Sequence, residues 1–161
     1  MPTVEEVHKE LDLIQDIIKR MANNSFKVKA WLMTIIAGVL TFSMRVLFPL
    51  KNRDVQESSS IVILFFLLVL TIVSWYLDAY YLRTERIYRN LYLWVVRNRS
   101  HTNNYLYDLS TFNRVIEGQS KDIREDVSSV FRIMISSTLS FFYCIPIIFI
   151  STLLIICIYH I

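Results

Sequence analysis

The chain has 161 residues, of which 54% are hydrophobic, and its formal net charge at pH 7 is +3. A soluble protein of this size buries only about two thirds of the surface of its unfolded chain, too little to hide so much apolar surface. The composition therefore disfavours a soluble globular protein and predicts an all-α membrane protein.

The apolar residues form three blocks, each long enough to cross a hydrocarbon core of about 30 Å at about 1.5 Å per helical residue. We therefore predict three transmembrane helices, at Trp31–Leu50, Ile61–Leu82 and Ile133–Tyr159. The predicted segments are a cytosolic amphipathic helix at 1–28, two transmembrane helices within 29–82, a cytosolic helical stalk and loop at 83–131, and a third transmembrane helix within 132–161.

Lysine and arginine residues predict how the chain crosses the membrane. Five precede the first block, two lie between the first and second blocks, and nine lie between the second and third; Arg45, near the end of the first block, would raise the count on the side of the two to three. Cytoplasmic segments carry the excess of basic residues. We therefore expect the N-terminus in the cytoplasm and the C-terminus outside.

The N-terminal segment has the periodicity of an amphipathic helix. Its apolar residues follow steps of four and three, and the stripe that they form consists of Val7, Leu11, Ile14, Ile18 and Met21. We assign the acidic residues Glu5, Glu6, Glu10, Asp12 and Asp16 to the opposite face. An acidic helix suits a protein partner better than anionic lipid. A second copy in a short coiled coil or the cytosolic loop of the same chain could cover the stripe, and we favour self-association.

Polar residues share one face on each of the first two spans. Thr34, Thr41 and Arg45 do so on the first, and Thr71, Ser74 and Asp78 on the second. Because the spans are antiparallel, we expect Thr34 near the level of Asp78 and Thr41 near Thr71, so that polar groups converge in the inner leaflet. They would either serve helix packing or, in an oligomer, line a water-filled path.

The two charged residues in these spans need partners or access to water. Arg45 either extends to the outer headgroups or forms a ring of charge at a pore mouth. For Asp78 we expect a structural salt bridge with Lys27, Lys29 or Arg83 at the inner interface.

The second span is predicted to continue as a helix beyond the membrane, because no Gly or Pro interrupts Tyr80–Val96. We expect a loop around Asn98–Thr111 and, at Ser120–Asp126, the start of the helix that leads into the third span. Basic residues beside the membrane would bind anionic lipid or, less readily, a phosphorylated second messenger; they are Lys27, Lys29, Arg83, Arg86 and Arg97.

Motifs of catalysis are missing from the sequence. It contains no phosphate-binding loop, nucleophile elbow or paired-cysteine site, and its three histidines are scattered. We therefore expect no enzyme activity, cofactor or metal site, and no nucleic-acid partner.

Two unusual strings carry a resemblance to known proteins. They are Arg20-Met-Ala-Asn-Asn-Ser-Phe-Lys-Val-Lys-Ala-Trp31 and Trp75-Tyr-Leu-Asp-Ala-Tyr-Tyr-Leu-Arg-Thr-Glu-Arg86. With them the chain resembles a family of small three-span bacterial membrane proteins often encoded near phage-defence genes. The resemblance implies the bacterial inner membrane and a membrane effector or membrane partner of an anti-phage system that answers a nucleotide signal or a cytosolic sensor protein.

Two functions from different classes fit these features. The first is a homo-oligomeric effector that forms a pore or disrupts the membrane once triggered. The alternative is a membrane anchor or scaffold that recruits a cytosolic defence partner through the Val4–Met21 helix and the loop Asn98–Asp126.

Overall fold

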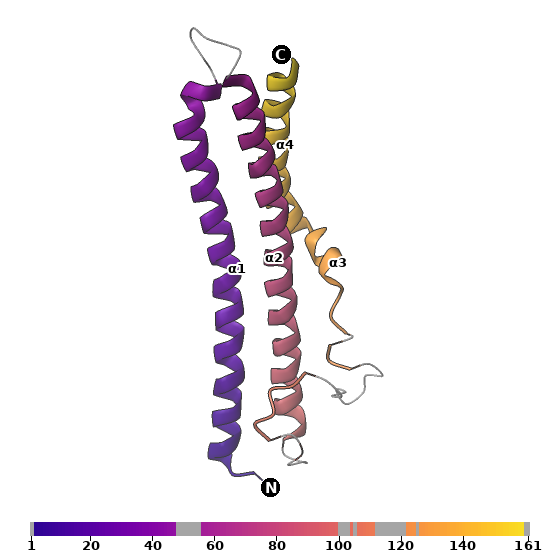
Figure 1. Cartoon of the computed structure of the whole chain (residues 1–161). Coiled ribbons are helices and arrows are strands. Elements are labelled where there is room, and N and C mark those ends of the chain that lie inside the picture. Colours follow the sequence, from indigo (N-terminus) through magenta and orange to yellow (C-terminus); the bar gives the residue numbers. More distant parts are fainter. Residues whose placement is uncertain are drawn as a thin grey trace. The chain divides into compact units, whose positions relative to one another are not determined.

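The computed structural model describes residues 2–47, 56–99, 104, 106–111, 122–124 and 126–159, with side chains outside 42–47 and 56–59. Within these ranges the protein consists of helices and connecting segments, and no β-strand occurs (Figure 1). The helices are α1 (Val4–Leu47), α2 (Gln56–Asn98), α3 (Val130–Met134) and α4 (Ser137–Tyr159). The predicted all-α class is confirmed.

Helix α1 begins with a reciprocal cap. The Thr3 hydroxyl accepts a hydrogen bond from the Glu6 amide at 3.2 Å, and the Glu6 carboxylate accepts one from the Thr3 amide at 2.7 Å. The hydrogen bonds from the Thr3 amide and hydroxyl lower the pKa of Glu6. From this cap α1 runs without interruption for 44 residues, so the predicted amphipathic helix and the described part of the predicted first span belong to one helix.

Helices α2 and α4 are long and apolar enough to cross a membrane. Only 22% of the most apolar stretch of α2 and 17% of that of α4 are buried, whereas the core helix of a soluble protein would be mostly buried. Large side chains such as Phe66 and Phe141 are exposed instead. Such a surface is typical of helices that face lipid. The predicted continuation of the second span as a helix is also confirmed, since α2 extends to Asn98.

The start of the third predicted span needs correction. The predicted helix start at Ser120–Asp126 is not found at the described residues 122–124 and 126, which form turns, bends and an isolated bridge. Helix α3 begins later, where the Ser129 hydroxyl accepts a 3.4 Å hydrogen bond from the Arg132 amide. A break at Ile135 and Ser136 then separates α3 from α4, so the block Ile133–Tyr159 is not one helix.

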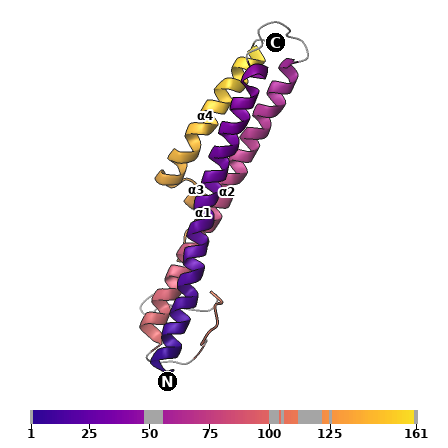
Figure 2. The ribbon, with the colours of Figure 1, turned by 90° about the vertical axis from the view of Figure 1, so that its left-hand side faces the viewer.

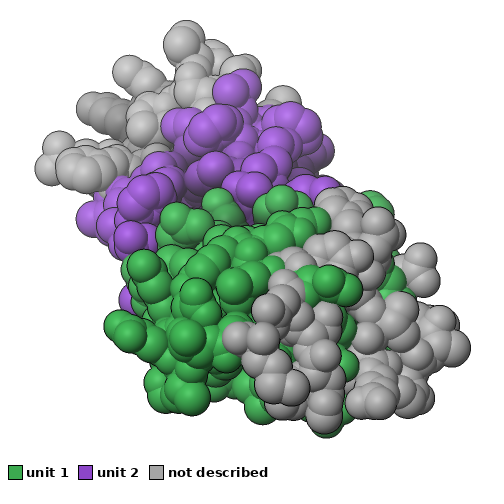
Figure 3. All heavy atoms as spheres, turned by 90° about the horizontal axis from the view of Figure 1, so that it is seen from below, with its two compact units in different colours: residues 1–25, 79–133 green, residues 26–78, 134–161 purple. Residues whose placement is uncertain are grey.

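The chain divides into two compact units, which Figure 3 distinguishes by colour. Unit 1 comprises Met1–Ser25 and Ala79–Ile133, and unit 2 comprises Phe26–Asp78 and Met134–Ile161. Helices α1 and α2 each contribute to both. The changes of unit after residues 25, 78 and 133 lie within four residues of the predicted segment boundaries after 28, 82 and 131.

In unit 2, parts of α1, α2 and α4 lie side by side (Figures 1 and 2). All three helices contribute to its core, whose buried members are Leu32, Ile36, Leu64, Leu67, Tyr143 and Ile150. A bundle of this kind hides the helix faces that point at one another and leaves the outer faces apolar and exposed.

In unit 1, the first half of α1 packs against the last part of α2, which runs in the opposite direction. Ile14 is 1% exposed and forms a core with Leu91, Trp94, Val95 and Ile123, while Leu11 and Ile18 pack against it partly buried. The predicted use of this stripe for self-association therefore needs correction, because its own chain already covers it. Val7, also assigned to the oligomer contact, is half-buried.

Candidate functional site

A buried group of polar side chains lies inside unit 2. The Asp78 side chain on α2 is 0% exposed, and the Nζ of Lys29 on α1 lies 2.5 Å from its Oδ2. The hydroxyl of Tyr143 on α4 donates a hydrogen bond to the same oxygen at 3.1 Å. We call these three residues the Asp78 cluster. One member comes from each helix of the bundle.

Neighbouring aromatic groups hold Tyr143 in this position. Trp75, one turn before Asp78, stacks on the Tyr143 ring with 5.8 Å between centroids and 11° between planes. The Trp75 indole nitrogen donates a hydrogen bond to the Met134 carbonyl at 3.1 Å, at the end of α3. The aromatic stack and this hydrogen bond thus fix the side of α4 that faces Asp78.

The Asp78 cluster confirms the predicted salt bridge and identifies its partner. Of the three candidates, Lys29 forms it, whereas Lys27 is exposed and Arg83 donates a 3.2 Å hydrogen bond from Nε to the Ser128 carbonyl. A buried carboxylate is tolerated only when it is paired and hydrogen-bonded, and Lys29 and Tyr143 meet both needs.

The other polar candidates on α1 and α2 fall into two groups. Thr71 and Ser74 are buried, and the Thr71 hydroxyl donates to the Leu67 carbonyl at 2.8 Å. Thr34 and Thr41 are exposed, and their hydroxyls donate to the carbonyls four residues earlier on α1.

The predicted convergence is therefore wrong for Thr34 and Thr41, because both side chains are exposed. Lys29, and not Thr34, is the α1 residue that reaches Asp78. The side chain of Arg45 lies outside the described residues.

Unit 1 contains a second buried ion pair, which sequence analysis missed. The Arg99 guanidinium donates from Nε to Glu10 Oε2 at 2.7 Å and from Nη2 to Oε1. It also donates to the Asn104 carbonyl at 2.7 Å and lies 5.6 Å from the centre of the Trp94 ring. Glu10 stands three residues after Val7 and four before Ile14, so its spacing places it on the apolar stripe and could have revealed it.

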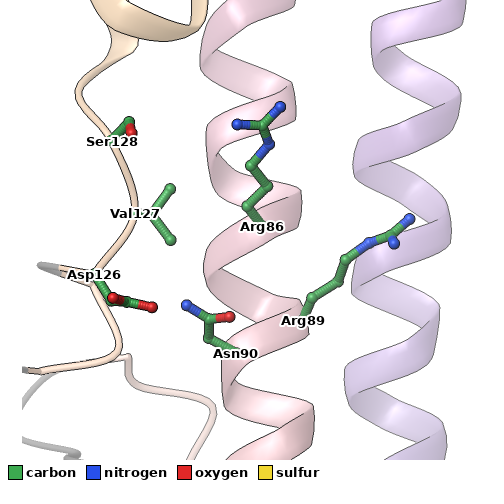
Figure 4. A pocket seen from close by; sticks show the side chains of 6 residues that line it. All are labelled: Arg86, Arg89, Asn90, Asp126, Val127 and Ser128. Carbon is green, nitrogen blue, oxygen red and sulfur yellow. The ribbon is translucent and has the colours of Figure 1, made fainter. Parts of the chain in front are cut away.

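The basic residues predicted beside the membrane are not equivalent. Arg86 lines a shallow pocket in unit 1 between α2 and the segment that leads to α3, together with Arg89, Asn90, Asp126, Val127 and Ser128 (Figure 4). Arg97 is exposed on the same helix and does not line it. Arg83 is tied to the same segment through Ser128.

Comparisons of the chain with protein-family models, curated proteins and solved structures give no match. Among the residues that the structure describes, no group of three or more His, Cys, Asp or Glu side chains could hold a metal ion. The two buried clusters consist of ion pairs and hydrogen bonds.

Proposed function

We propose that the protein is a homo-oligomeric membrane effector of bacterial anti-phage defence that makes the inner membrane permeable when it is triggered. In this proposal Trp31–Leu50 is a third span, the N-terminus is cytoplasmic and the C-terminus is outside. The basic residues between the second and third apolar blocks support the orientation. The resemblance to bacterial proteins encoded near phage-defence genes supports the setting, with a sensor protein or nucleotide messenger as the trigger.

The Asp78 cluster is the observation that carries this proposal. An anchor needs only apolar side chains in its spans, whereas an ionisable residue there is costly and by default indicates a functional site. Asp78 is fully buried, its charge is balanced within one chain by Lys29 at 2.5 Å, and the Tyr143 hydroxyl donates a hydrogen bond to it at 3.1 Å. We interpret this paired arrangement as the closed state of the proposed pore.

Opening would require the cluster to separate. One chain has too few helices to enclose a pore, so a conducting path needs several copies. The exposed hydroxyl-bearing face of α1 at Thr34 and Thr41 is available for such a path, whereas Thr71 and Ser74 are buried. A trigger that draws Lys29 away from Asp78 and moves the three helices apart would expose the buried carboxylate to this path and favour cations.

Breaking the ion pair should open the pore without a trigger. We would reconstitute full-length protein into liposomes at a measured oligomeric state and follow potassium efflux. Lys29→Met leaves Asp78 without its cation, so we expect a higher basal efflux than from wild type. Lys27→Met removes the same charge two residues away at an exposed position and should change nothing.

A double variant separates opening from simple damage. Lys29→Met combined with Asp78→Leu removes both charges, and we expect efflux to return to the wild-type level. Equal leakage from the single and double variants would reject the Asp78 cluster as a closure. No efflux from any variant, with an intact oligomer, would instead support a scaffold, even though its expected docking stripe at Leu11, Ile14 and Ile18 is already covered.

A further inference from the structure

The shallow pocket of unit 1 brings opposite charges to one opening. Arg86, Arg89 and Asn90 come from α2, and Asp126, Val127 and Ser128 come from the facing segment. Figure 4 shows the Arg89 side chain extending away from that segment, and its guanidinium pairs with Glu85 at 2.6 Å. Arg86 and Asp126 are the two charged groups that remain at the pocket.

These two charges have no partner in the described part of the chain. Neither the Arg86 guanidinium nor the Asp126 carboxylate forms an ion pair or a side-chain hydrogen bond with another described residue, and both side chains are exposed. Asn90 holds the pocket wall in place, because its amide donates a 3.2 Å hydrogen bond to the Ile123 carbonyl. Arg83 does the same through the Ser128 carbonyl at 3.2 Å. The opening is thus braced on both sides, while its two charges stay available.

We propose that this pocket binds the phosphoethanolamine headgroup of a membrane phospholipid. The guanidinium of Arg86 would bind the phosphate, which it suits because its planar fork can donate two parallel hydrogen bonds. The hydroxyl of Ser128 supplies a further donor to the phosphate, and the carboxylate of Asp126 would bind the ammonium group. A purely anionic ligand would leave Asp126 opposing it, which favours a headgroup that carries both charges.

The position of Arg86 along the sequence favours a lipid as the source of this headgroup, and this step rests on the membrane arrangement of the proposed function. Arg86 follows Leu82, the end of the predicted second span, by four residues, which is about 6 Å of helix. The headgroup layer occupies about 5 to 7 Å on each side of the hydrocarbon core. Arg86 therefore falls at the level of the lipid phosphates.

Native mass spectrometry of the full-length protein in a maltoside detergent can test the proposal. We would add dioctanoyl phosphatidylethanolamine, phosphatidylglycerol or phosphatidylcholine at equal concentrations and compare the bound fractions. We expect wild type to prefer phosphatidylethanolamine. Arg86→Gln should weaken its binding at least about tenfold, the usual effect of losing a charge-assisted hydrogen bond.

Substitution of Asp126 should change the binding of only one of the lipids in this way. Asp126→Asn should weaken binding of phosphatidylethanolamine but should not weaken that of phosphatidylglycerol, which has no ammonium group for the carboxylate to bind and whose phosphate the carboxylate opposes. Arg20→Gln and Asp12→Asn remove the same charges at exposed positions of unit 1 and should leave all binding unchanged. The proposal is overturned by equal effects of Arg86→Gln and Arg20→Gln, or by an unchanged lipid preference in Asp126→Asn.

Glycerophosphoethanolamine, the same headgroup without acyl chains, distinguishes the two sources of the phosphate. We expect it to bind far more weakly than the lipid. Binding as tight as that of the lipid would overturn a lipid site and indicate a soluble phosphorylated amine. Because no ion flux enters these measurements, failure here leaves the pore proposal standing, and the efflux assay on Lys29→Met likewise leaves this one untouched.

Discussion

Replacing Glu10 with glutamine removes one charge from the buried ion pair of unit 1. The side chain of Glu10 is 0% exposed and that of Arg99 is 2% exposed, so the substitution leaves a guanidinium buried opposite a neutral amide. Loss of one partner from a buried pair costs about 3 to 5 kcal/mol. Arg99 keeps the Asn104 carbonyl at 2.7 Å and the Trp94 ring at 5.6 Å, so we expect about 3 kcal/mol, the lower end of that range.

Hydrogen exchange of the full-length protein in lipid nanodiscs measures this loss. A change of about 3 kcal/mol in local stability corresponds to roughly a hundredfold faster exchange. We expect this acceleration in peptides from 4–25 and 88–99, which carry the two sides of the core around Ile14 and Leu91. Peptides from α4, which belongs to unit 2, serve as the internal reference.

The double variant Glu10→Leu with Arg99→Met provides the decisive comparison. Apolar residues of similar volume can replace a buried pair at little cost, so the double variant should exchange more slowly than Glu10→Gln alone. Asp12→Asn, an exposed acid on the same helix, should behave like wild type. If the double variant loses as much protection as the single one, the loss comes from altered packing, and our account in terms of an uncompensated charge is wrong.

Three further predictions concern unit 1. Ile14→Ala should lower stability by about 2 to 5 kcal/mol in the same exchange assay, and Leu13→Ala, at a side chain 40% exposed, by much less. The pKa of Glu6 is lower in the folded protein than in the unfolded chain, so the ionised Glu6 carboxylate stabilises the fold at pH values above the unfolded pKa. This stabilisation is lost as the pH falls through the folded pKa. Thr3→Ala keeps the backbone amide and removes the hydroxyl, so it should raise that pKa part of the way towards its ordinary value in a carboxyl NMR titration; an unchanged pKa would contradict the contribution of the hydroxyl. The pKa of Tyr107 is raised mainly by desolvation and, to a smaller extent, by the carboxylates of α1. The contribution of Tyr107 to the stability of the fold is therefore present below pH 10 and is lost as the pH rises through the folded pKa. A ring-carbon NMR titration should find Tyr107 still mostly protonated at pH 10, and half-ionisation there would refute this.

The sequence predicted the all-helical fold and the two apolar helices α2 and α4 because helix formation and apolar composition depend on local patterns. The lack of Gly and Pro in Tyr80–Val96 predicted that the helix continues past Leu82, and α2 does continue to Asn98. The helix that leads into the predicted third span was expected to begin too early, because a polar stretch alone does not show which of its residues caps the helix. Ser129, whose hydroxyl accepts from the Arg132 amide, provides the cap nine residues after the predicted start.

Pairings between distant residues could be predicted only in part. The ion pair of Asp78 could be predicted because a charge in a span is costly unless it is paired. Helix geometry explains why Lys29 and not Lys27 is the partner: the two are about 200° apart around α1, so only one can face inward. Tyr143 and Arg99 were missed, because they lie 65 residues from Asp78 and 89 residues from Glu10. No local periodicity relates residues so far apart.

The Asp78 cluster also bears on how the chain is inserted during synthesis. Taken singly, Lys29 and Asp78 would each oppose the transfer of its own helix into lipid. Paired at 2.5 Å, they present little net charge, so in the proposed arrangement α1 and α2 are expected to enter the bilayer together as a hairpin. Tyr143 is the last of the three residues to be synthesised, so its hydroxyl can complete the Asp78 cluster only when α4 packs against α1 and α2. Ribosome-bound chains that end before α4 should therefore hold the ion pair in an incomplete, more hydrated form.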